Sequence, residues 1–319
     1  MSKNKKLGIP YMGSKRKISS NILDYIQIHN PNATIIFDLF GGGGAISFEA
    51  LQRKQFKRVI YNEFNIGIVE LLRKIQNKGV NKDFYNWVSR EDFVQNKDKD
   101  TWLGGLVKTC WSFGNNQRSY LFSKNIEQDK RLLHEIVVNK CEKSRLKFES
   151  IFIIDKDYLL IEPMTKRRLA IMDKIKKEAS RIDLQQLESI QRLQQLQQLQ
   201  QLQQLERLEQ LQQLQQLQQL EISNESYEDV LINTPIKQTI IYIDPPYSKT
   251  NKYQLDICQD KLLKYIKESP YKIYVSSYDF DLPCVHEIIH RSTLSANSNN
   301  KVIERLFCNK EETINYKLF

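Results

Sequence analysis

The chain has 319 residues, of which 40% are hydrophobic and 27% charged, so it can bury a large core and is not a wholly disordered protein. Lysine and arginine (48) exceed aspartate and glutamate (38), and the formal net charge of +10 favours an anionic partner such as nucleic acid, a nucleotide or an acidic surface. No run approaches the roughly 20 apolar residues of a membrane-spanning helix, and no apolar signal segment follows the basic start, so we expect a cytosolic protein without a membrane anchor.

Residues 34–63 show the pattern of a strand, a glycine turn, a helix and a second strand. An apolar run at 34–40 ends in four glycines, a helix is expected at 45–52, and a strand is expected at 58–61. Glu63 follows this strand, where a carboxylate can accept hydrogen bonds from ribose hydroxyls. Because the glycines do not form the phosphate-binding pattern of dinucleotide or ATP sites, we expect a nucleoside-like ligand without an essential phosphate contact.

Residues 76–183 are aromatic, basic and less regular, and we expect a second, inserted and mainly helical domain there. Its polar cluster beside aromatic residues comprises Asn115, Asn116, Gln117 and Arg118. Asn and Gln suit the edge of adenine, and Arg suits guanine. Lys124, with Lys130 and Arg131, suits phosphates. The basic runs at 166–168 and 174–177 are either further phosphate contacts or a solvated helix face.

Residues 184–220 form a low-complexity segment with an apolar residue at every third position and Gln in most places between. On an α-helix each step of three residues turns about 300°, so the apolar stripe moves about 60° per repeat and no single face is the buried one. The propensities of Leu and Gln favour a helix. We interpret the segment as a tolerated expansion within a surface loop, with an oligomerisation element as the alternative.

The most specific signal follows an apolar strand expected at 239–243. Asp244, Pro245, Pro246 and Tyr247 come directly after it. The prolines end the strand and hold the Asp244 carboxylate and the Pro245 carbonyl as two outward-facing acceptors. Such a pair suits the exocyclic amino group of a purine, and Tyr247 can stack on the base.

Metal-binding patterns are weak. Five cysteines lie too far apart to cage zinc, so we expect reduced thiols: Cys110, Cys141, Cys258, Cys284 and Cys308. His286, Glu287 and His290 match the zinc-protease pattern H-E-x-x-H. The residues after Pro283 also fit the start of an ordinary amphipathic helix, which we prefer. We therefore expect no metal, and a zinc hydrolase would leave the glycine turn unexplained.

A further strand is expected at 272–276. Strands that alternate with helices on both sides of residues 76–220 predict an α/β fold with a mostly parallel sheet and helices on both faces.

Jointly, these residues resemble the class alpha, Dam-type DNA adenine-N6 methyltransferases, particularly those of phages and prophages. The resemblance covers both ends of the chain and much of its middle, and rests on Tyr11 to Lys17, Phe40 to Gly44, Asn62 to Asn65, Ser226 to Val230 and Asp244 to Tyr247. Two positions depart from the family. Glu63 stands where Asp is frequent, and Ser14 stands where a second Gly is common.

The resemblance implies a Rossmann-like methyltransferase domain in two parts, 1–75 and 221–319, separated by a target-recognition domain at 76–183 and the repeat segment at 184–220. It implies S-adenosylmethionine as the cofactor, bound by Tyr11, Gly13, Lys15, Asp38, Phe40, Gly42, Gly44, Glu63, Asp229 and Asp244. The implied catalytic residues are Asp244, Pro245, Pro246 and Tyr247. The expected DNA contacts are Asn115, Asn116, Gln117, Arg118 and Lys124.

The expected reaction is the in-line transfer of a methyl group to the exocyclic N6 of a flipped-out adenine in double-stranded DNA, without a metal. A cytosine-N4 enzyme is the closest alternative, although it more often has Ser where Asp244 stands. A nicotinamide enzyme would need a different glycine pattern, and a non-catalytic DNA-binding protein would assemble through the repeat. We expect a monomer in a bacterial or phage-infected cell, of the kind found in restriction–modification, and leave assembly through 184–220 open.

Overall fold

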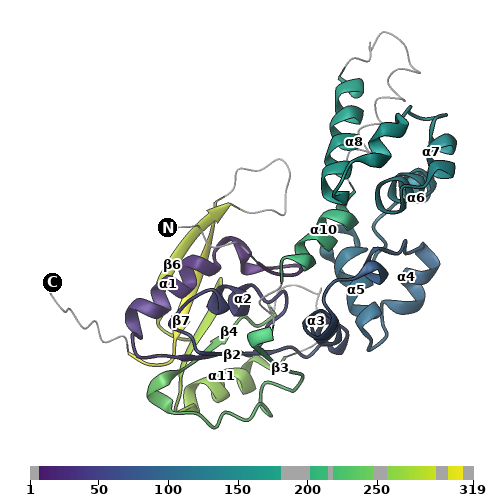
Figure 1. Cartoon of the computed structure of the whole chain (residues 1–319). Helices are drawn as coiled ribbons and strands as arrows, with labels where there is room; N and C mark the ends of the chain where they lie inside the picture. The colour runs from purple at the N-terminus through teal and green to yellow at the C-terminus, as the bar shows by residue number, and fades with distance from the viewer. Residues whose placement is uncertain (1–6, 181–201, 215–217, 247–256, 292–300, 312–319) are drawn as a thin grey trace. The chain divides into compact units, whose positions relative to one another are not determined.

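The computed structural model describes residues 7–180, 202–214, 218–246, 257–291 and 301–311, in two compact units (Figure 1). Unit 1 takes its described residues from Met1–Gly79, Asp100–Gly105 and Gln213–Phe319. Unit 2 takes them from Val80–Lys99 and Leu106–Gln212. The helix α5 (Trp102–Cys110) runs across the division. Among the described helices, none combines the length and the apolar character needed to cross a lipid bilayer.

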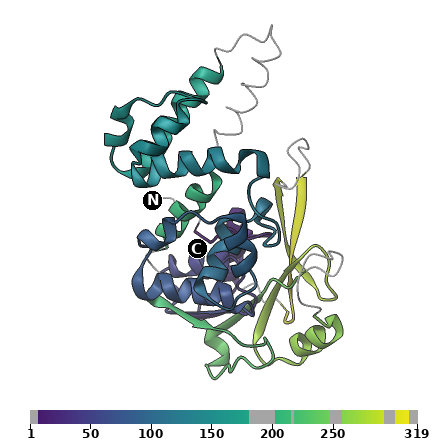
Figure 2. The ribbon, with the colours of Figure 1, turned by 90° about the vertical axis from the view of Figure 1, so that its right-hand side faces the viewer.

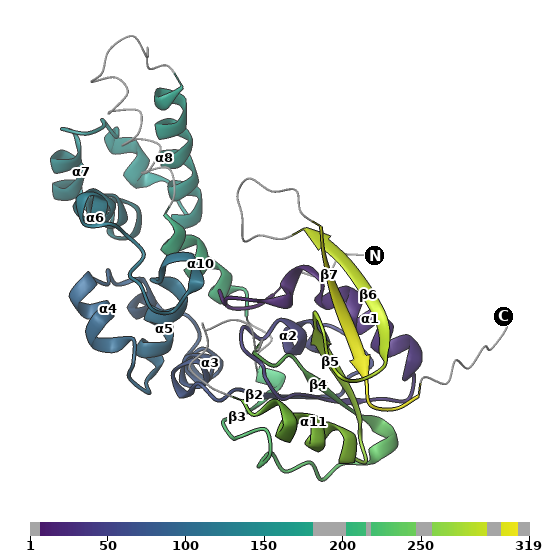
Figure 3. The ribbon, with the colours of Figure 1, turned by 180° about the vertical axis from the view of Figure 1, so that it is seen from behind.

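Unit 1 is built on one sheet, whose described strands follow the order β3-β2-β1-β4-β5-β7-β6 (Figures 1 and 3). The strands are β1 (Ile35–Asp38), β2 (Arg58–Asn62), β3 (Leu220–Ser223), β4 (Thr239–Ile243), β5 (Lys272–Ser277), β6 (Cys284–Arg291) and β7 (Lys301–Cys308). The pairs from β3 to β5 are parallel, and β7 runs antiparallel to both β5 and β6. The predicted α/β class and mostly parallel sheet are confirmed.

Helices cover both faces of this sheet. The helices of unit 1 are η1 (Lys15–Lys17), α1 (Ser19–His29), α2 (Ala45–Leu51), α3 (Ile66–Lys78), η6 (Ile236–Gln238) and α11 (Gln259–Glu268). Helix α11 lies on one face, where its Leu262 and Ile266 pack with Phe37, Ile241 and Ile273, and α1 and α2 lie on the other (Figures 1 and 3). Burial on both faces explains why the central strands are continuous apolar runs rather than alternating ones.

The prediction of an amphipathic helix after Pro283 is wrong. Residues 284–291 form strand β6, which lies beside β7 at the end of the sheet (Figure 2). Ile288 is buried and Ile289 is exposed, which is the alternation of a strand with one covered face. The His286 ring stacks on Tyr25 with 4.7 Å between ring centroids. In the described part of the chain, no group of three or more His, Cys, Asp or Glu could hold a metal ion.

Unit 2 is helical in its described residues. Its helices are η2 (Lys82–Tyr85), α4 (Arg90–Asn96), η3 (Phe113–Asn115), α6 (Lys124–Asn139), α7 (Glu142–Phe148), η4 (Lys156–Leu160), α8 (Met164–Ala179) and α10 (Gln203–Gln212). Its core holds an aromatic group in which Trp87 stacks on Phe122 and meets Trp111 edge-on, with ring centroids 5.8 and 5.1 Å apart. Such pairs add to the stabilisation from buried area.

Part of the Leu/Gln repeat lies in the core of unit 2, so a surface-loop expansion does not hold for residues 202–212. Four repeat leucines of this unit are fully buried: Leu202, Leu205, Leu208 and Leu211. The leucines of the repeat point to different sides of the helix α10. They can all be buried because α10 is short and is contacted on several sides. Gln204 and Arg207 are also buried, and Arg207 donates hydrogen bonds to the carbonyls of Cys110 (3.1 Å) and Ser112 (2.7 Å). Residues 184–201 and 215–217 of the repeat segment lie outside the described residues.

Candidate active site

The glycine turn connects the carboxyl end of β1 to α2. Gly44 is the N-cap of α2 with φ 70°, and a Cβ there would lie 2.4 Å from the Phe48 ring. Gly42 has φ 47°, and its carbonyl accepts a hydrogen bond from the Tyr61 hydroxyl (2.8 Å). Only glycine adopts such backbone angles at no cost. The shape of the turn is therefore fixed by contacts within the protein itself.

Glu63 joins this turn to the end of β2. Its Oε2 accepts a hydrogen bond from the Gly42 N–H (2.8 Å), and its Oε1 accepts one from the Asn65 N–H (2.9 Å). An ionised carboxylate has about four acceptor positions, so both oxygens can accept further hydrogen bonds. The carboxylate is thus held in place beside the turn and remains suited to a pair of hydroxyl groups.

Asp244 follows β4 and lies at the same edge of the sheet as the turn, because β4 pairs in parallel with β1 and Asp38 is opposite Tyr242. Its Oδ1 accepts a hydrogen bond from the Lys15 ammonium (2.8 Å). Burial raises the pKa of Asp244 to about 6, although the Lys15 charge opposes this rise. Pro245 is buried and Pro246 half-buried. Tyr247 lies outside the described residues.

The ends of β1, β2 and β4 form an acidic edge. Asp38 is buried, accepts a hydrogen bond from Ser47 (2.7 Å), and has its pKa raised to about 7 by burial and, more weakly, by the charges of Asp244 and Glu63. Negative charges that raise the pKa of a nearby carboxyl also create a negative potential there. This edge therefore suits a ligand with a positive centre.

The other residues expected at the cofactor also belong to unit 1. A Cβ on Gly42 would lie 3.2 Å from the Tyr11 ring, so Tyr11 borders the turn. Phe40 is half-buried, with its ring centroid 5.5 Å from that of Tyr227. Gly13 is exposed, with φ 76°, in the segment before η1. Asp229 is exposed in the loop between β3 and β4, where its N–H donates to the Ser226 carbonyl (2.9 Å).

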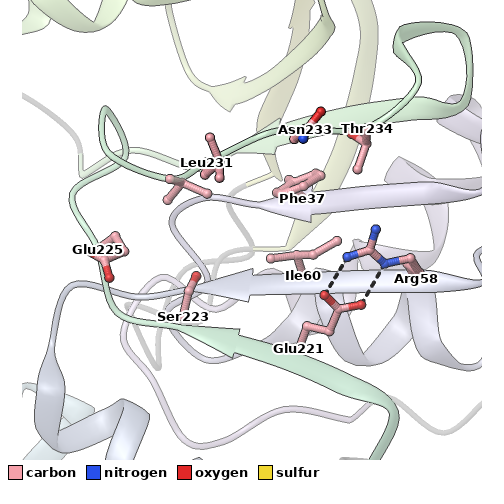
Figure 4. A pocket seen from close by; sticks show the side chains of 10 residues that line it. Phe37, Arg58, Ile60, Glu221, Ser223, Glu225, Leu231, Asn233 and Thr234 are labelled. Carbon is pink, nitrogen blue, oxygen red and sulfur yellow. Dashed lines mark hydrogen bonds and ion pairs between the residues drawn. The ribbon is translucent and has the colours of Figure 1, made fainter.

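A cavity of about 280 Å³ lies on the β1–β2–β3 face of the sheet, beside the loop after β3 (Figure 4). Its walls include the apolar side chains of Phe37, Ile60 and Leu231 and the exposed ion pair between Arg58 and Glu221 (2.7 Å). Its described lining contains none of the residues predicted to bind cofactor or DNA. We therefore place the candidate site at the acidic edge and not in this cavity.

The predicted recognition cluster forms a tight loop in unit 2. Ser112 and Tyr120 pair across its base, and the Phe113 N–H donates to the Ser119 carbonyl (2.8 Å). The Asn116 Oδ1 accepts hydrogen bonds from the N–H groups of Arg118 (2.9 Å) and Ser119 (3.0 Å), so it supports the loop.

The remaining members of the cluster differ in exposure. Asn115 and Gln117 are half-buried with positive φ angles of 58° and 61°. The side chains of Arg118 and, at the start of α6, Lys124 are exposed. These two are therefore the members of the cluster most exposed to solvent.

Three basic residues are buried in unit 2, although Lys130 was expected at phosphates and Arg167 and Arg168 either at phosphates or on a solvated helix face. Lys130 is 4% exposed, and burial lowers its pKa to about 8. Arg167 donates to the carbonyls of Val137 and Ile161 (both 2.8 Å). Arg168 pairs with acids of α10, Glu206 (3.1 Å) and Glu209 (2.9 Å). The run at 166–168 therefore has a largely structural role, because Arg167 binds backbone carbonyls and Arg168 forms ion pairs with α10.

Two residues behind Asp244 were not predicted. Glu304 of β7 lies 3.5 Å from the Lys15 ammonium, and Ser276 of β5 donates a hydrogen bond to the same Glu304 oxygen (2.7 Å). Glu304 lies within strand β7 and is buried, but no motif in the sequence singles it out.

Comparison with known proteins finds a family model that matches the chain. A family model described as D12 class N6 adenine-specific DNA methyltransferase matches residues 11–153 and 173–280, more than half of the chain. The matched ranges contain the glycine turn, Glu63, the recognition loop and Asp244. No curated protein matches the chain.

Proposed function

The chain belongs to the D12 class N6 adenine-specific DNA methyltransferase family, and we propose that it takes the methyl group from S-adenosylmethionine. The family assigns it to adenine-N6 methylation of DNA rather than to cytosine-N4 methylation or to binding without catalysis. The observation that carries the proposed site is the ion pair between Lys15 and Asp244 (2.8 Å) at the sheet edge that also holds the glycine turn and Glu63.

The residues at this edge fit the proposed cofactor. S-adenosylmethionine, when bound, supplies an electrophilic methyl group on a positively charged sulfur. The carboxylates of Asp38, Glu63 and Asp244 suit that charge, and Glu63 would accept hydrogen bonds from the ribose hydroxyls. Tyr11, Gly13, Lys15, Phe40, Gly42, Gly44 and Asp229 are the further residues proposed to line the cofactor site.

Glu63→Gln tests the cofactor assignment. The amide keeps one acceptor but loses the charge and the second acceptor, and a hydrogen bond to a charged group contributes about 1.5–3 kcal/mol. We therefore expect the Kd for S-adenosylmethionine to rise about 10- to 100-fold, as measured by titration calorimetry without DNA. The control is Glu221→Gln, which removes an exposed carboxylate from the same sheet. Equal affinity in Glu63→Gln and Glu221→Gln would contradict the assignment.

We propose that Asp244 and the Pro245 carbonyl orient the adenine amine. Each would accept one hydrogen bond from N6, so that the nitrogen lone pair points at the methyl group. Burial raises the pKa of Asp244 to about 6, so the carboxylate is ionised at neutral pH and can take the proton that N6 releases after transfer. Tyr247 is proposed to stack on the base.

Unit 2 is proposed as the target-recognition domain, with Asn115, Asn116, Gln117, Arg118 and Lys124 as DNA contacts, and unit 1 as the catalytic domain. The exposed Arg118 side chain on a tight loop supports this, because arginine can bind guanine through two hydrogen bonds. Lys124 is exposed at the start of α6 and suits a phosphate.

Arg118→Ala is expected to weaken binding to the preferred site about 10-fold or more and to relax the choice of methylated sites, because one bidentate base contact is worth about 1–3 kcal/mol. Long-read sequencing of DNA from expressing cells would give the site pattern, and fluorescence anisotropy the affinity. Arg118→Lys keeps the positive charge but lacks the planar guanidinium group. Compared with Arg118→Ala, it should restore the affinity for DNA more than the selectivity for the methylated site. Unchanged patterns and affinity in Arg118→Ala would show that the recognition residues lie elsewhere.

The proposed enzyme is of the Dam type, close to those of phages and prophages, and it acts on double-stranded DNA in the cytoplasm of a bacterial or phage-infected cell. Its chemistry needs no metal, because the sulfonium is already a good leaving group. Burial of the repeat leucines at 202–212 inside unit 2 supports a monomer rather than assembly through this part of the repeat.

A further inference from the structure

Behind Asp244 lies a buried charged cluster that the family match does not include in full, since the match ends at residue 280. Glu304 of β7 is 2% exposed. Its Oε1 accepts a hydrogen bond from the Ser276 hydroxyl of β5 (2.7 Å) and lies 3.5 Å from the Lys15 ammonium. The same ammonium donates to Asp244 Oδ1 at 2.8 Å. The ammonium therefore lies between two carboxylates from different strands.

Burying a carboxylate is costly unless hydrogen bonds and an opposite charge compensate for the lost water. Glu304 has both, from Ser276 and Lys15. Within this group of three side chains, one ammonium faces two carboxylates. The cluster therefore carries one net negative charge when all three groups are ionised, and the Asp244 side chain, 21% exposed, is its most accessible member.

We propose that Glu304 is a positioning residue for methyl transfer, which holds Lys15 against Asp244 and leaves a net negative charge beside the target amine. This inference rests on the proposed role of Asp244. Without Glu304, Lys15 and Asp244 would form a neutral pair, and Lys15 would lose its anchor on the side of β7.

The charge matters because of how the reaction proceeds. The bond between adenine N6 and the methyl carbon forms as the bond between that carbon and sulfur breaks, so N6 gains a positive charge. A proton then leaves N6 for the Asp244 carboxylate and passes on to solvent. A net negative cluster stabilises the charge that develops on N6, which a neutral pair would do less well.

The pKa of Asp244 reflects the same arrangement. Burial raises it, Lys15 lowers it and the negative charge of Glu304 raises it. Among the described residues, the ionisable groups that interact with Asp244 also include Asp38, whose pKa is itself raised, and the hydroxyls of Tyr242 and Tyr278, whose pKa values lie above the ordinary tyrosine value. Both tyrosines therefore stay uncharged at neutral pH, and Glu304 is the negatively charged neighbour that raises the pKa of Asp244.

Glu304→Gln tests the proposal, because the amide oxygen still accepts the Ser276 hydrogen bond while the charge is lost. We expect kcat to fall about 10-fold or more, with the KM for S-adenosylmethionine unchanged. Removing a negative neighbour lowers the pKa of Asp244, so the acid limb of the kcat profile should move to lower pH. Glu304→Asp, which keeps the charge, should leave the limb near its wild-type position.

The control is Glu287→Gln on the adjacent strand β6, which removes one negative charge from an exposed side chain and should change neither kcat nor the profile. A loss of kcat in Glu304→Gln without movement of the acid limb would overturn the proposal, as would wild-type behaviour. Ser276→Ala removes the hydrogen bond and keeps both carboxylates, and it should lower kcat less. Full activity in Ser276→Ala would contradict the proposal even if Glu304→Gln did not fold. Activity in Asp244→Asn would instead disprove the proposed function.

Discussion

Asp244→Ala is expected to abolish methyl transfer while leaving DNA binding measurable. The substitution removes the acceptor that would orient the adenine amine and take up its proton, and it leaves the Lys15 ammonium facing the site without its 2.8 Å partner. The site then changes from a net negative to a neutral cluster, which stabilises a positive charge on N6 less effectively. We expect kcat to fall by about 10³-fold or more, because positioning and charge stabilisation are lost together.

Three measurements separate this effect from misfolding. Methyl incorporation into DNA should vanish, whereas DNA affinity by fluorescence anisotropy and cofactor affinity by calorimetry should stay within about tenfold of the wild type. Asp244→Asn keeps the shape of the side chain and should be nearly as inactive. Asp281→Asn, an exposed aspartate that pairs with Lys267, is the matched control and should be fully active. Normal turnover in Asp244→Ala would disprove the proposed role of Asp244 in methyl transfer.

The wild-type pH profile carries a related expectation. The pKa of Asp244 is raised to about 6, so the carboxylate gains its proton as the pH falls through this value. A protonated Asp244 cannot take up the proton from N6, and kcat should therefore decline below about pH 6. The limb is assigned to Asp244, whose pKa depends on burial and on the charges of Lys15 and Glu304.

The parallel core of unit 1 could be predicted from the sequence because its central strands are each marked by a local sequence pattern. The strands β1 and β4 are short apolar runs, each ended by residues that cannot continue a strand, Gly41 after one and Pro245 after the other. Parallel strands bring such ends to one edge of a sheet, so the strand pattern alone is enough to predict that Asp38, Glu63 and Asp244 lie near one another.

The features that escaped prediction depend on distant partners. Residues 284–291 have no local signal that distinguishes a strand from a helix. They form a strand because they pair with β7. Glu304 is unremarkable in sequence and becomes important only because Lys15 and Ser276 meet it in space. The burial of residues 202–212 escapes prediction for the same reason, since the period of the repeat forbids one buried face but allows a short helix that is buried on several sides.

Leu208→Gln is expected to destabilise unit 2 strongly, although it hardly changes the composition of the repeat. Leu208 is fully buried in α10. The substitution leaves a void where the branched methyl groups packed, and it buries an amide that needs hydrogen-bond partners. Replacing a buried leucine costs about 2–5 kcal/mol, so the free energy of unfolding of unit 2 should fall by about that amount. Thermal unfolding followed by circular dichroism would measure the loss.

Leu169→Gln is the matched control, because Leu169 of α8 is 57% exposed in the same unit and undergoes the same chemical change. It should alter the free energy of unfolding by no more than about 0.5 kcal/mol. If Leu208→Gln is no more destabilising than Leu169→Gln, residues 202–212 do not form part of the core of unit 2, and the repeat is a dispensable surface expansion after all. If Leu208→Gln alone lowers stability together with DNA affinity, this stretch of the repeat supports the unit proposed to read DNA.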